Sequence, residues 1–365
     1  AVSFVKKINK NTGIIKLNTF TNTASSEFKK GLKSLIEQNI ENLIIDLRSN
    51  GGGLLNEAVK IVSLFVSKGE LVVSTKSRIP QMNRSYNTLE QPIAPNLPVV
   101  VLIDEMSASA SEIVAGSLQD LDRAVIIGNT SYGKGLVQQT KQVSFGGQIK
   151  LTVAKYYTPS GRCIQKIDYS TKSGASKKIE DSLVRKYVTR NGREVVDSRG
   201  IEPDIKVEAQ YFNAITEAIL NEDLIFEFTN GIISSFENDS LSPLNFSIEE
   251  ATYNKFIDFA LSKEIDYQTA SNFHLEELKD VASKEKYIKE NEALFLQMDS
   301  VFKTDVRKDL KKHKSEIIFF LENEIISRKH FQSGRVEASL KKDPFIIASE
   351  KIFEADSTYS HLLGF

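Results

Sequence analysis

The 365-residue sequence predicts an α/β core followed by a mainly α-helical C-terminal region. Up to about residue 207, short apolar runs of strand length alternate with amphipathic helical patterns, which is the rhythm of an α/β domain. Beyond residue 207 only three of the 19 glycines remain, at 231, 334 and 364, and apolar residues recur at helical spacing. We therefore expect two domains, residues 1–207 and residues 208–365.

The elements of the core are expected in alternating order. Strand-length apolar runs predict strands at 12–17, 42–47, 71–74, 98–104 and 123–128. Apolar residues at helical spacing predict helices at 28–36, 54–65 and 109–121, the first of them behind the capping residues Ser25 and Ser26. The pattern becomes typical of β-hairpins at 148–157 and around the Asn191-Gly192 pair.

The C-terminal region carries two apolar stripes at helical spacing. One contains Leu294, Met298, Val301 and Phe302, and the other contains Ile317, Phe320, Leu321 and Ile325. The charge-rich segment 303–314 is interpreted as a solvated helix face rather than a nucleic-acid patch.

Composition argues against several classes of partner and of site. The 48 acidic and 47 basic residues give a formal charge of −1, which does not favour nucleic acid or an anionic membrane as the main partner. No run approaches the roughly 18 apolar residues of a membrane span, and no signal peptide is visible. The single cysteine, Cys163, excludes an internal disulfide framework and a cysteine-based zinc site. No metal or organic cofactor is expected.

Ser109 and Lys134 are the most informative residues. Ser109 lies in a cluster of small residues, 106–113, that opens a predicted helix, and Lys134 follows 134 − 109 = 25 positions later between two glycines. A hydroxyl at a helix start lies near free backbone N–H groups, and a desolvated lysine can act as a base in its neutral form. All four histidines lie beyond residue 207, so a Ser-His-Asp triad in the core would need a distant base.

Three glycines, Gly51 to Gly53, stand between a predicted buried strand and a helix. Such a run can be a flexible turn, or it can bring backbone N–H groups close to a ligand. Combined with the serine and lysine downstream, the glycines are candidates for an oxyanion hole that stabilises a tetrahedral intermediate. The N–H of Ala110, directly after the serine, is the second candidate donor.

A nucleotide-binding loop is the competing interpretation of the segment before Lys134. Gly128, Gly133 and Lys134 match the first part of a P-loop and follow a predicted strand. However, position 135 is glycine where the magnesium-binding hydroxyl is required, and residues 136–143 do not form a convincing helix pattern. The acidic strand 99–105 also precedes the loop instead of following it. These features disfavour an ATPase.

The sequence resembles the carboxyl-terminal processing proteases, also called tail-specific proteases. The resemblance spans residues 40 to 205 and is carried by five segments in the family's order. They are Asp46-Leu47-Arg48-x-Asn50-x-Gly52-Gly53, Ser107 to Ile113, Ser131-x-Gly133-Lys134-Gly135-x-Val137-Gln138, Lys155 to Arg162, and Gly200-Ile201-x-Pro203-Asp204. The helical C-terminal region resembles the extension of some family branches.

The resemblance implies a role for each matched residue. The nucleophile falls on Ser109 and the general base on Lys134, while Gly52, Gly53 and Ala110 fall at the oxyanion hole. Gln138 matches a residue that holds the lysine in place, but it lies about 6 Å from Lys134 only in a helical turn, against about 13 Å in a strand. Glu112 and Asp120 match acidic positions that are important in the family, so one of them is a candidate to help position the site, the alternative being a helix-surface charge or a local hydrogen bond. Ser131 stands where the family often has threonine.

The resemblance also implies a fold, a reaction and a place of action. These are a crotonase/ClpP-like serine protease core and hydrolysis of proteins near apolar C-terminal tails through an acyl-enzyme, in the periplasm or cell envelope. The family's substrate-capturing PDZ domain is expected to be absent from this chain, because the core pattern begins within about a dozen residues of Ala1. The helical region is a candidate surface for self-association or for an adaptor protein. The alternative function is a non-catalytic peptide-binding or scaffold protein on the same fold.

Overall fold

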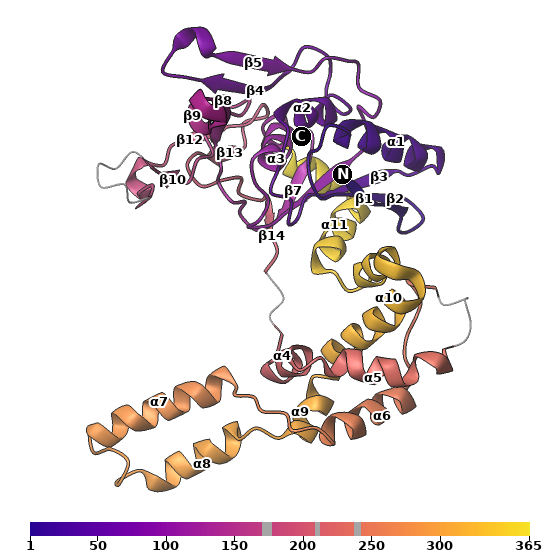
Figure 1. Cartoon of the computed structure of the whole chain (residues 1–365), viewed down its shortest axis with the longest axis vertical. Coiled ribbons are helices and arrows are strands. Elements are labelled where there is room, and N and C mark those ends of the chain that lie inside the picture. The colour runs from indigo at the N-terminus through magenta and orange to yellow at the C-terminus, as the bar shows by residue number, and fades with distance from the viewer. Residues whose placement is uncertain (170–176, 209–211, 237–241) are drawn as a thin grey trace. The chain divides into compact units, whose positions relative to one another are not determined.

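The computed structural model describes residues 1–169, 177–208, 212–236 and 242–365 and divides the chain into two compact units (Figure 1). The core unit comprises Ala1–Ala209 together with Pro344–Phe365, and the helical unit comprises Gln210–Asp343. The α/β fold class followed by a helical region is therefore confirmed. The division differs from the sequence boundary at residue 207 in one respect, because the last 22 residues (365 − 344 + 1) pack with the core.

The core unit is built on a six-stranded sheet with the order β1-β2-β3-β6-β7-β14. The strands are β1 (Val2–Lys7), β2 (Thr12–Leu17), β3 (Asn42–Asp46), β6 (Val99–Ile103), β7 (Val125–Gly128) and β14 (Ile205–Lys206). Only β1 runs antiparallel to its neighbour, and all the other pairs are parallel. The connections from β2 to β3 and from β6 to β7 each contain one helix, whereas the described residues between β7 and β14 form only strands, 3₁₀ turns and loops.

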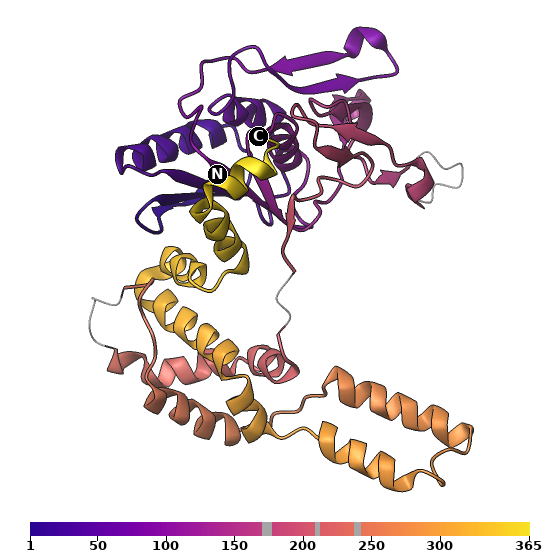
Figure 2. The same cartoon turned by 180° about the vertical axis from the view of Figure 1, so that it is seen from behind.

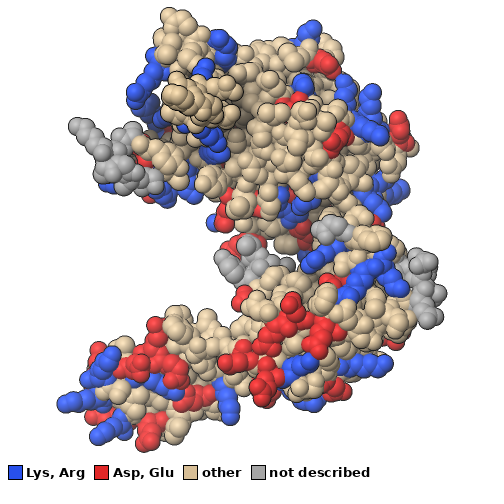
Figure 3. All heavy atoms as spheres, in the orientation of Figure 1, with Lys and Arg blue, Asp and Glu red and all other residues tan. Residues whose placement is uncertain are grey.

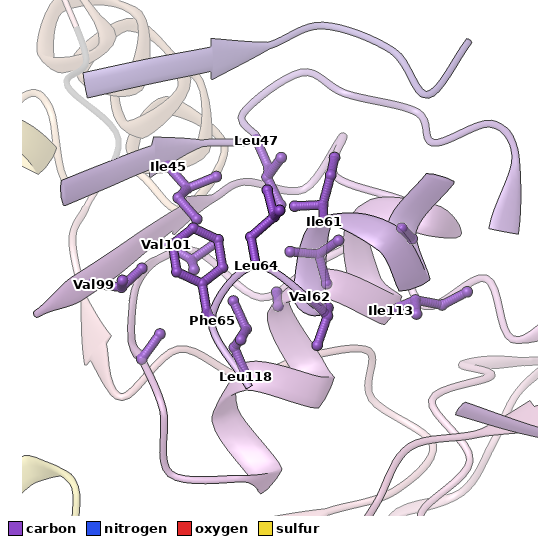
Figure 4. Packing of buried hydrophobic residues seen from close by; sticks show 14 of the residues in the cluster. Ile45, Leu47, Ile61, Val62, Leu64, Phe65, Val99, Val101, Ile113 and Leu118 are labelled. Carbon is purple, nitrogen blue, oxygen red and sulfur yellow. The ribbon is translucent and has the colours of Figure 1, made fainter. Parts of the chain in front are cut away.

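One face of this sheet packs against α1 (Ala24–Glu37), α2 (Leu55–Val62) and α3 (Ala110–Asp120). Figure 4 shows Ile45 and Val101 of the sheet pointing toward Phe65, which follows α2, and toward side chains of α2 and α3. All eleven residues of α3 are buried, including its polar ones. The helix that begins at the candidate nucleophile is therefore held rigidly from all sides.

The other face of the sheet is also dry. Ile44, Val100 and Ile127 are fully buried although they alternate with the residues that face α1 to α3. In Figure 1, α11 (Pro344–Glu354) lies on this side, and it contacts β7. The hydroxyl of Tyr359, in α12 (Asp356–Leu362), accepts the Val99 N–H at 2.9 Å. The C-terminal helices thus supply the cover that a parallel sheet needs on its second face.

A second, antiparallel sheet has the order β5-β4-β9-β8. Its strands are β4 (Leu71–Lys76), β5 (Arg84–Asn87), β8 (Leu136–Gln142) and β9 (Gln148–Tyr157). Two further hairpins are β10 (Ile167–Asp168) with β11 (Lys177–Lys178), and β12 (Lys186–Val188) with β13 (Glu194–Val196) around Asn191-Gly192. Short 3₁₀ turns in the core unit occupy Pro80–Met82, Ser144–Gly146 and Asp181–Leu183.

The helical unit contains α4 to α10 and its own apolar core. The helices are α4 (Ala214–Asn221), α5 (Leu224–Ile232), α6 (Glu250–Leu261), α7 (Ala270–Lys284), α8 (Glu292–Phe302), α9 (Val306–Lys312) and α10 (Lys314–Leu340), and a 3₁₀ turn occupies Ile233–Ser235. The stripe of α10 is buried as its periodicity predicts, since Ile317, Leu321 and Ile325 are inaccessible to solvent. The α8 stripe is not, because no residue of α8 is buried.

Helices α7 and α8 contact each other and form a two-helix arm of the helical unit (Figures 1 and 2). Among the described residues, no helix combines the length and apolarity that crossing a bilayer would require. On the face drawn in Figure 3, acidic and basic side chains are interspersed over both units.

Candidate active site

Three segments of the core unit meet at Ser109. They are the loop after β3, the start of α3 and the loop between β7 and β8. A Cβ atom built on Gly52 would lie 2.8 Å from the Ser109 Cβ and 2.9 Å from the Ala110 nitrogen. The Tyr132 N–H, in the third segment, donates to the Ser107 carbonyl at 3.0 Å.

Ser109 has a strained backbone at the N-cap of α3. Its φ is +58° and its ψ is −111°, a conformation that a residue with a side chain adopts only when its surroundings enforce it. The neighbouring serines have structural hydrogen bonds, because Ser107 Oγ donates to the Leu47 carbonyl and Ser111 Oγ to the Asn50 carbonyl, both at 2.8 Å. Within the serine cluster, these contacts leave Ser109 as the candidate nucleophile.

The glycine loop is held by Asn50, which is fully buried. Its side chain accepts the Gly52 N–H at 2.9 Å and donates to the Leu17 carbonyl at 2.6 Å. The N–H of Gly52 is therefore occupied, which speaks against Gly52 as an oxyanion donor. Among the described residues, the N–H groups of Gly53 and Ala110 have no hydrogen-bond acceptor.

Gly52 and Gly53 each allow a different segment of backbone to pack closely against the loop. Gly52, with φ of +97°, leaves room for α3, because an added Cβ would lie 2.5 Å from the Ala108 carbonyl oxygen. Gly53, with φ of +146°, packs against the backbone of Phe20, whose carbonyl oxygen would lie 2.4 Å from an added Cβ.

Glu112 joins the nucleophile segment to the lysine segment. Its Oε2 accepts the Ser109 N–H at 2.7 Å and the Lys134 N–H at 2.9 Å. Its Oε1 accepts the Ser131 hydroxyl at 2.6 Å and the Gly133 N–H at 2.7 Å. The carboxyl group is fully buried. Burial raises the pKa of Glu112 above its ordinary value, although hydrogen bonds from all four donors act to lower it.

Ser131 extends the hydrogen-bond network of Glu112 to the segment around Ile201. Its hydroxyl donates to Glu112 and accepts the Ile201 N–H at 2.7 Å. Ser131 therefore connects the lysine loop to the segment that carries Gly200 and Ile201 through its hydroxyl group.

Lys134 is half-buried, and among the described residues its ammonium group makes no hydrogen bond or ion pair. Its carbonyl accepts a hydrogen bond from the Tyr156 hydroxyl of β9, which also lies 3.3 Å from the Ser109 carbonyl. Tyr156 thus contacts both candidate catalytic residues through their main chains. Burial raises its pKa well above the ordinary value.

Gln138 does not lie where the sequence reasoning needed it. An orienting contact with Lys134 required a helical turn, but residues 136–142 form the strand β8 and Gln138 is exposed. No hydrogen bond connects Gln138 to Lys134 among the described residues. The condition for an orienting role of Gln138, a helical turn at this point, is therefore not met.

Asp120 lies at the far end of α3, eleven residues after Ser109, or about 16 Å along the helix axis. It pairs with Arg162 at 2.8 Å, and both side chains are fully buried. Its other oxygen accepts the Ser160 N–H at 3.0 Å. Of the two acidic candidates, only Glu112 contacts the site, and Asp120 anchors α3 to the segment after β9.

Asp46, which is buried, pairs with the partly buried Arg48 next to the glycine loop. The Arg48 guanidinium contacts both Asp46 oxygens, at 2.9 and 2.8 Å, and Lys16 lies 3.1 Å from the same carboxyl. Burial alone would raise the pKa of Asp46, but the two cations hold it below its ordinary value. Arg48 also lies over the Phe345 ring of α11, 4.7 Å from its centroid.

Sequence reasoning did not assign roles to Asn50, Tyr156 or Arg162, although all three fall inside the matched motifs. The signal that could have found Asn50 is a polar residue directly before three glycines, where an Asx turn is common. Among the described residues, no cluster of three or more His, Cys, Asp or Glu side chains could hold a metal ion.

Two family models match the chain. Residues 11–173 match peptidase family S41, and residues 215–353 match the C-terminal helical domain of a probable PDZ-protease. The core is an S41 peptidase domain. The first match covers every candidate site residue, and the second covers most of the helical unit.

Relatives agree with this assignment. A probable CtpA-like serine protease of Staphylococcus epidermidis is 31% identical over 276 residues, covering 74% of this chain and 54% of that protein. A carboxyl-terminal-processing protease of Picosynechococcus is 39% identical over 162 residues, covering 44% of this chain and 38% of that protein. This chain thus spans about half the length, or less, of these relatives.

Among solved structures, the photosystem II D1 C-terminal processing protease is similar to this chain. It has a TM-score of 0.42 and 28% sequence identity, and the match covers 54% of this chain and 42% of that one.

Proposed function

We propose that this chain is a serine endopeptidase that uses Ser109 and Lys134 as a catalytic pair and cleaves protein substrates near their C-terminal tails. The observation that carries the proposal is the buried Glu112 carboxylate, which accepts the backbone N–H groups of both residues. A single anchor for nucleophile and base keeps their segments in a fixed relation, which an acyl-transfer site requires.

The reaction follows from these positions. Ser109 Oγ attacks the peptide carbonyl carbon while its proton passes to the neutral amine of Lys134. The N–H groups of Ala110 and Gly53 stabilise the oxyanion. The C–N bond then breaks, and Lys134 returns the proton to the leaving amine. Water, deprotonated by Lys134, hydrolyses the ester of Ser109 and releases the new carboxyl terminus.

The proposal includes a preference for apolar substrate segments. Three large apolar side chains remain exposed on the segments that form the site: Leu54 is 51% exposed, Met106 63% and Tyr132 47%. Leu54 directly follows Gly53, and Tyr132 lies two residues before Lys134. Apolar groups left in water beside a reacting centre gain from covering apolar substrate side chains.

The test is hydrolysis of an unfolded protein with an apolar C-terminus, followed by measuring product masses. Wild-type protein, Ser109→Ala and Lys134→Arg are compared, with the exposed Lys68→Ala as the matched lysine control. Cleavage by wild type and Lys68→Ala alone is expected, because guanidinium does not lose its proton near neutral pH.

Substantial hydrolysis by Ser109→Ala would contradict the assigned nucleophile. Tight substrate binding without cleavage by the wild-type protein would favour the alternative, a non-catalytic peptide-binding protein on the same fold.

The helical unit is proposed to bind a second copy of the chain or an adaptor protein. Its α7–α8 arm supports this, because Val281, Leu296 and Val301 are each at least half exposed. Analytical ultracentrifugation of the wild-type and Leu296→Asp proteins, each without an adaptor, tests self-association. Equal molar masses for the two proteins would exclude self-association through this arm. As the family resemblance implies, we expect action in the periplasm or cell envelope, which cell fractionation can test.

A further inference from the structure

The hairpin of β8 and β9 extends beyond the rest of its sheet. Strand β4 pairs with β9 only at residues 155–157. From Gln138 to Thr152 the hairpin is therefore a two-stranded ribbon. All ten residues at 138–142 and 148–152 are exposed to solvent. Such a ribbon is of marginal stability without a third strand or a packed face.

The hydrogen-bond register identifies the backbone groups at the free edge of β8. The Val143 N–H donates to the Gly147 carbonyl, so Gln142 and Gln148 form a pair that does not exchange hydrogen bonds. Because hydrogen-bonded and non-hydrogen-bonded pairs alternate along an antiparallel ladder, Thr140 and Lys150 also form a pair that does not exchange hydrogen bonds. The N–H and C=O groups of Thr140 point away from β9, and those of Lys150 point away from β8.

The edge of β8 lacks the usual protection against added strands. Natural edge strands carry charges, prolines or inward-pointing lysines that prevent pairing with another chain. Of the seven residues of β8 only Lys141 is charged, and none is proline. Among the described strands, none pairs with this edge.

The base of this edge lies at the candidate active site. Strand β8 begins two residues after Lys134, and Tyr156 of β9 donates to the Lys134 carbonyl. The opposite edge of the ribbon, along β9, ends against β4 at Lys155. A chain added to β8 therefore leads to Lys134, whereas a chain added to β9 meets another strand.

The charge and apolar surface of the hairpin suit a polypeptide chain. Residues 136–157 contain three lysines and no acidic residue. Ile149 and Leu151, on one face of the ribbon, are each 43% exposed. A neutral or acidic extended segment with apolar side chains matches this surface in both charge and polarity.

We propose that the free edge of β8 binds the substrate chain as an added strand and guides it to Ser109. Recognition is through the main chain, since the outward groups of Gln138, Thr140 and Gln142 pair with alternate residues of the substrate. This binding mode requires an unfolded substrate segment and tolerates many sequences. It rests on the proposed protease function, because the occupant is the substrate of that reaction.

The test uses the full chain with Ser109→Ala, so that binding is measured without hydrolysis. A fluorescently labelled, unstructured acidic peptide with apolar side chains is titrated, and its Kd is read from fluorescence anisotropy. Thr140→Pro removes one outward N–H from the β8 edge, where proline is structurally tolerated. Lys150→Pro, directly opposite in the register, is the matched control on the other edge. Thr140→Ala and Lys150→Gln control for the side chains.

Loss of a main-chain hydrogen bond should raise Kd about three- to tenfold in Thr140→Pro alone. Equal weakening by the two proline variants, or no effect of Thr140→Pro, would overturn the proposal. Peptides with single N-methyl groups test the same edge in the Ser109→Ala chain without a proline variant. Methylation should weaken binding at every second residue, and a pattern without this period would contradict strand addition.

The two proposals can fail separately. If wild-type protein cleaves and Ser109→Ala does not, but the β8 variants bind normally, the protease function stands and the β8 edge is excluded. If the β8 variants lose binding and no protein cleaves, the edge is a peptide-binding site without the proposed chemistry.

Discussion

The Glu112 carboxylate accepts the backbone N–H of Lys134 at 2.9 Å, across 134 − 112 = 22 residues of chain. The same oxygen accepts the N–H of Ser109. The candidate base and nucleophile are therefore coupled through their main chains by one buried group. Neither of these two contacts uses the side chain of Ser109 or of Lys134.

Glu112→Gln should reduce kcat/KM strongly and destabilise the protein by about 2 kcal/mol, because the new amide N–H₂ faces N–H groups that need an acceptor. Circular dichroism during urea unfolding measures the stability, and peptide hydrolysis measures kcat/KM. Glu105→Gln, on the exposed turn before the serine cluster, is the control for loss of one negative charge. Full activity in Glu112→Gln would show that the shared anchor is dispensable.

Gly52→Ala should abolish most activity, whereas Gly51→Ala should not. A methyl group at Gly52 meets backbone atoms of Ala108 and Ala110 below 3.0 Å, and at Gly51 it meets nothing within 4 Å. Displacing Ala110 by a few tenths of an ångström misplaces an oxyanion donor, and loss of one such donor lowers kcat about 10²–10³-fold. Steady-state kinetics on the two variants decide this, and comparable kcat values would refute the proposed position of the oxyanion hole.

Tyr156→Phe should lower kcat with little effect on KM, because the hydroxyl contacts the carbonyls of Lys134 and Ser109 rather than the substrate. We expect a loss of about tenfold, which corresponds to roughly 1.4 kcal/mol, the scale of one hydrogen bond. Tyr157→Phe, at the next position of β9, is the control. A change confined to KM would indicate that Tyr156 instead binds the substrate.

Asp46→Asn should destabilise the protein at neutral pH, and the difference from wild type should shrink in acid. The folded-state pKa of Asp46 is lowered, so its ionised form stabilises the fold above the ordinary pKa of 3.8. That contribution is lost as the pH falls through the lowered value. Because Arg48 and Lys16 are partly exposed, we expect a loss of about 2 kcal/mol, the scale of hydrogen bonds to a charged group. Urea unfolding at pH 7 and at decreasing acid pH measures it, and a difference that grows in acid would contradict the assignment.

The order of strands and helices around the site could be predicted from the sequence, because each element has a strong local pattern. β2 spans the predicted residues 12–17, and α3 starts one residue after the predicted position, at Ala110. The nucleophile could be separated from Ser107 and Ser111 by spacing, and these two have structural hydrogen bonds. Local pattern and motif spacing were sufficient here.

Features that depend on long-range contacts could not be predicted from the sequence. Residues 136–142 form a strand because they pair with β9, which no local pattern of Gln138 indicates. Asp120 pairs with Arg162, and nothing in the sequence around either residue indicates that contact. Pro344–Phe365 have a helical pattern like the region before them, and only the uncovered second face of the sheet explains their packing with the core.

Because these last residues fold onto the core, the helical unit is an insertion joined to it by two chain connections. After a cut in the backbone of either connection, the two fragments would stay together non-covalently, because α11 and α12 pack against the rest of the core unit. A chain cut after residue 208 and lacking everything beyond would instead expose the buried side chains of Ile44, Val100 and Ile127 to water. The C-terminal helices are therefore structurally part of the protease domain, although more than 130 residues separate them from it in the sequence.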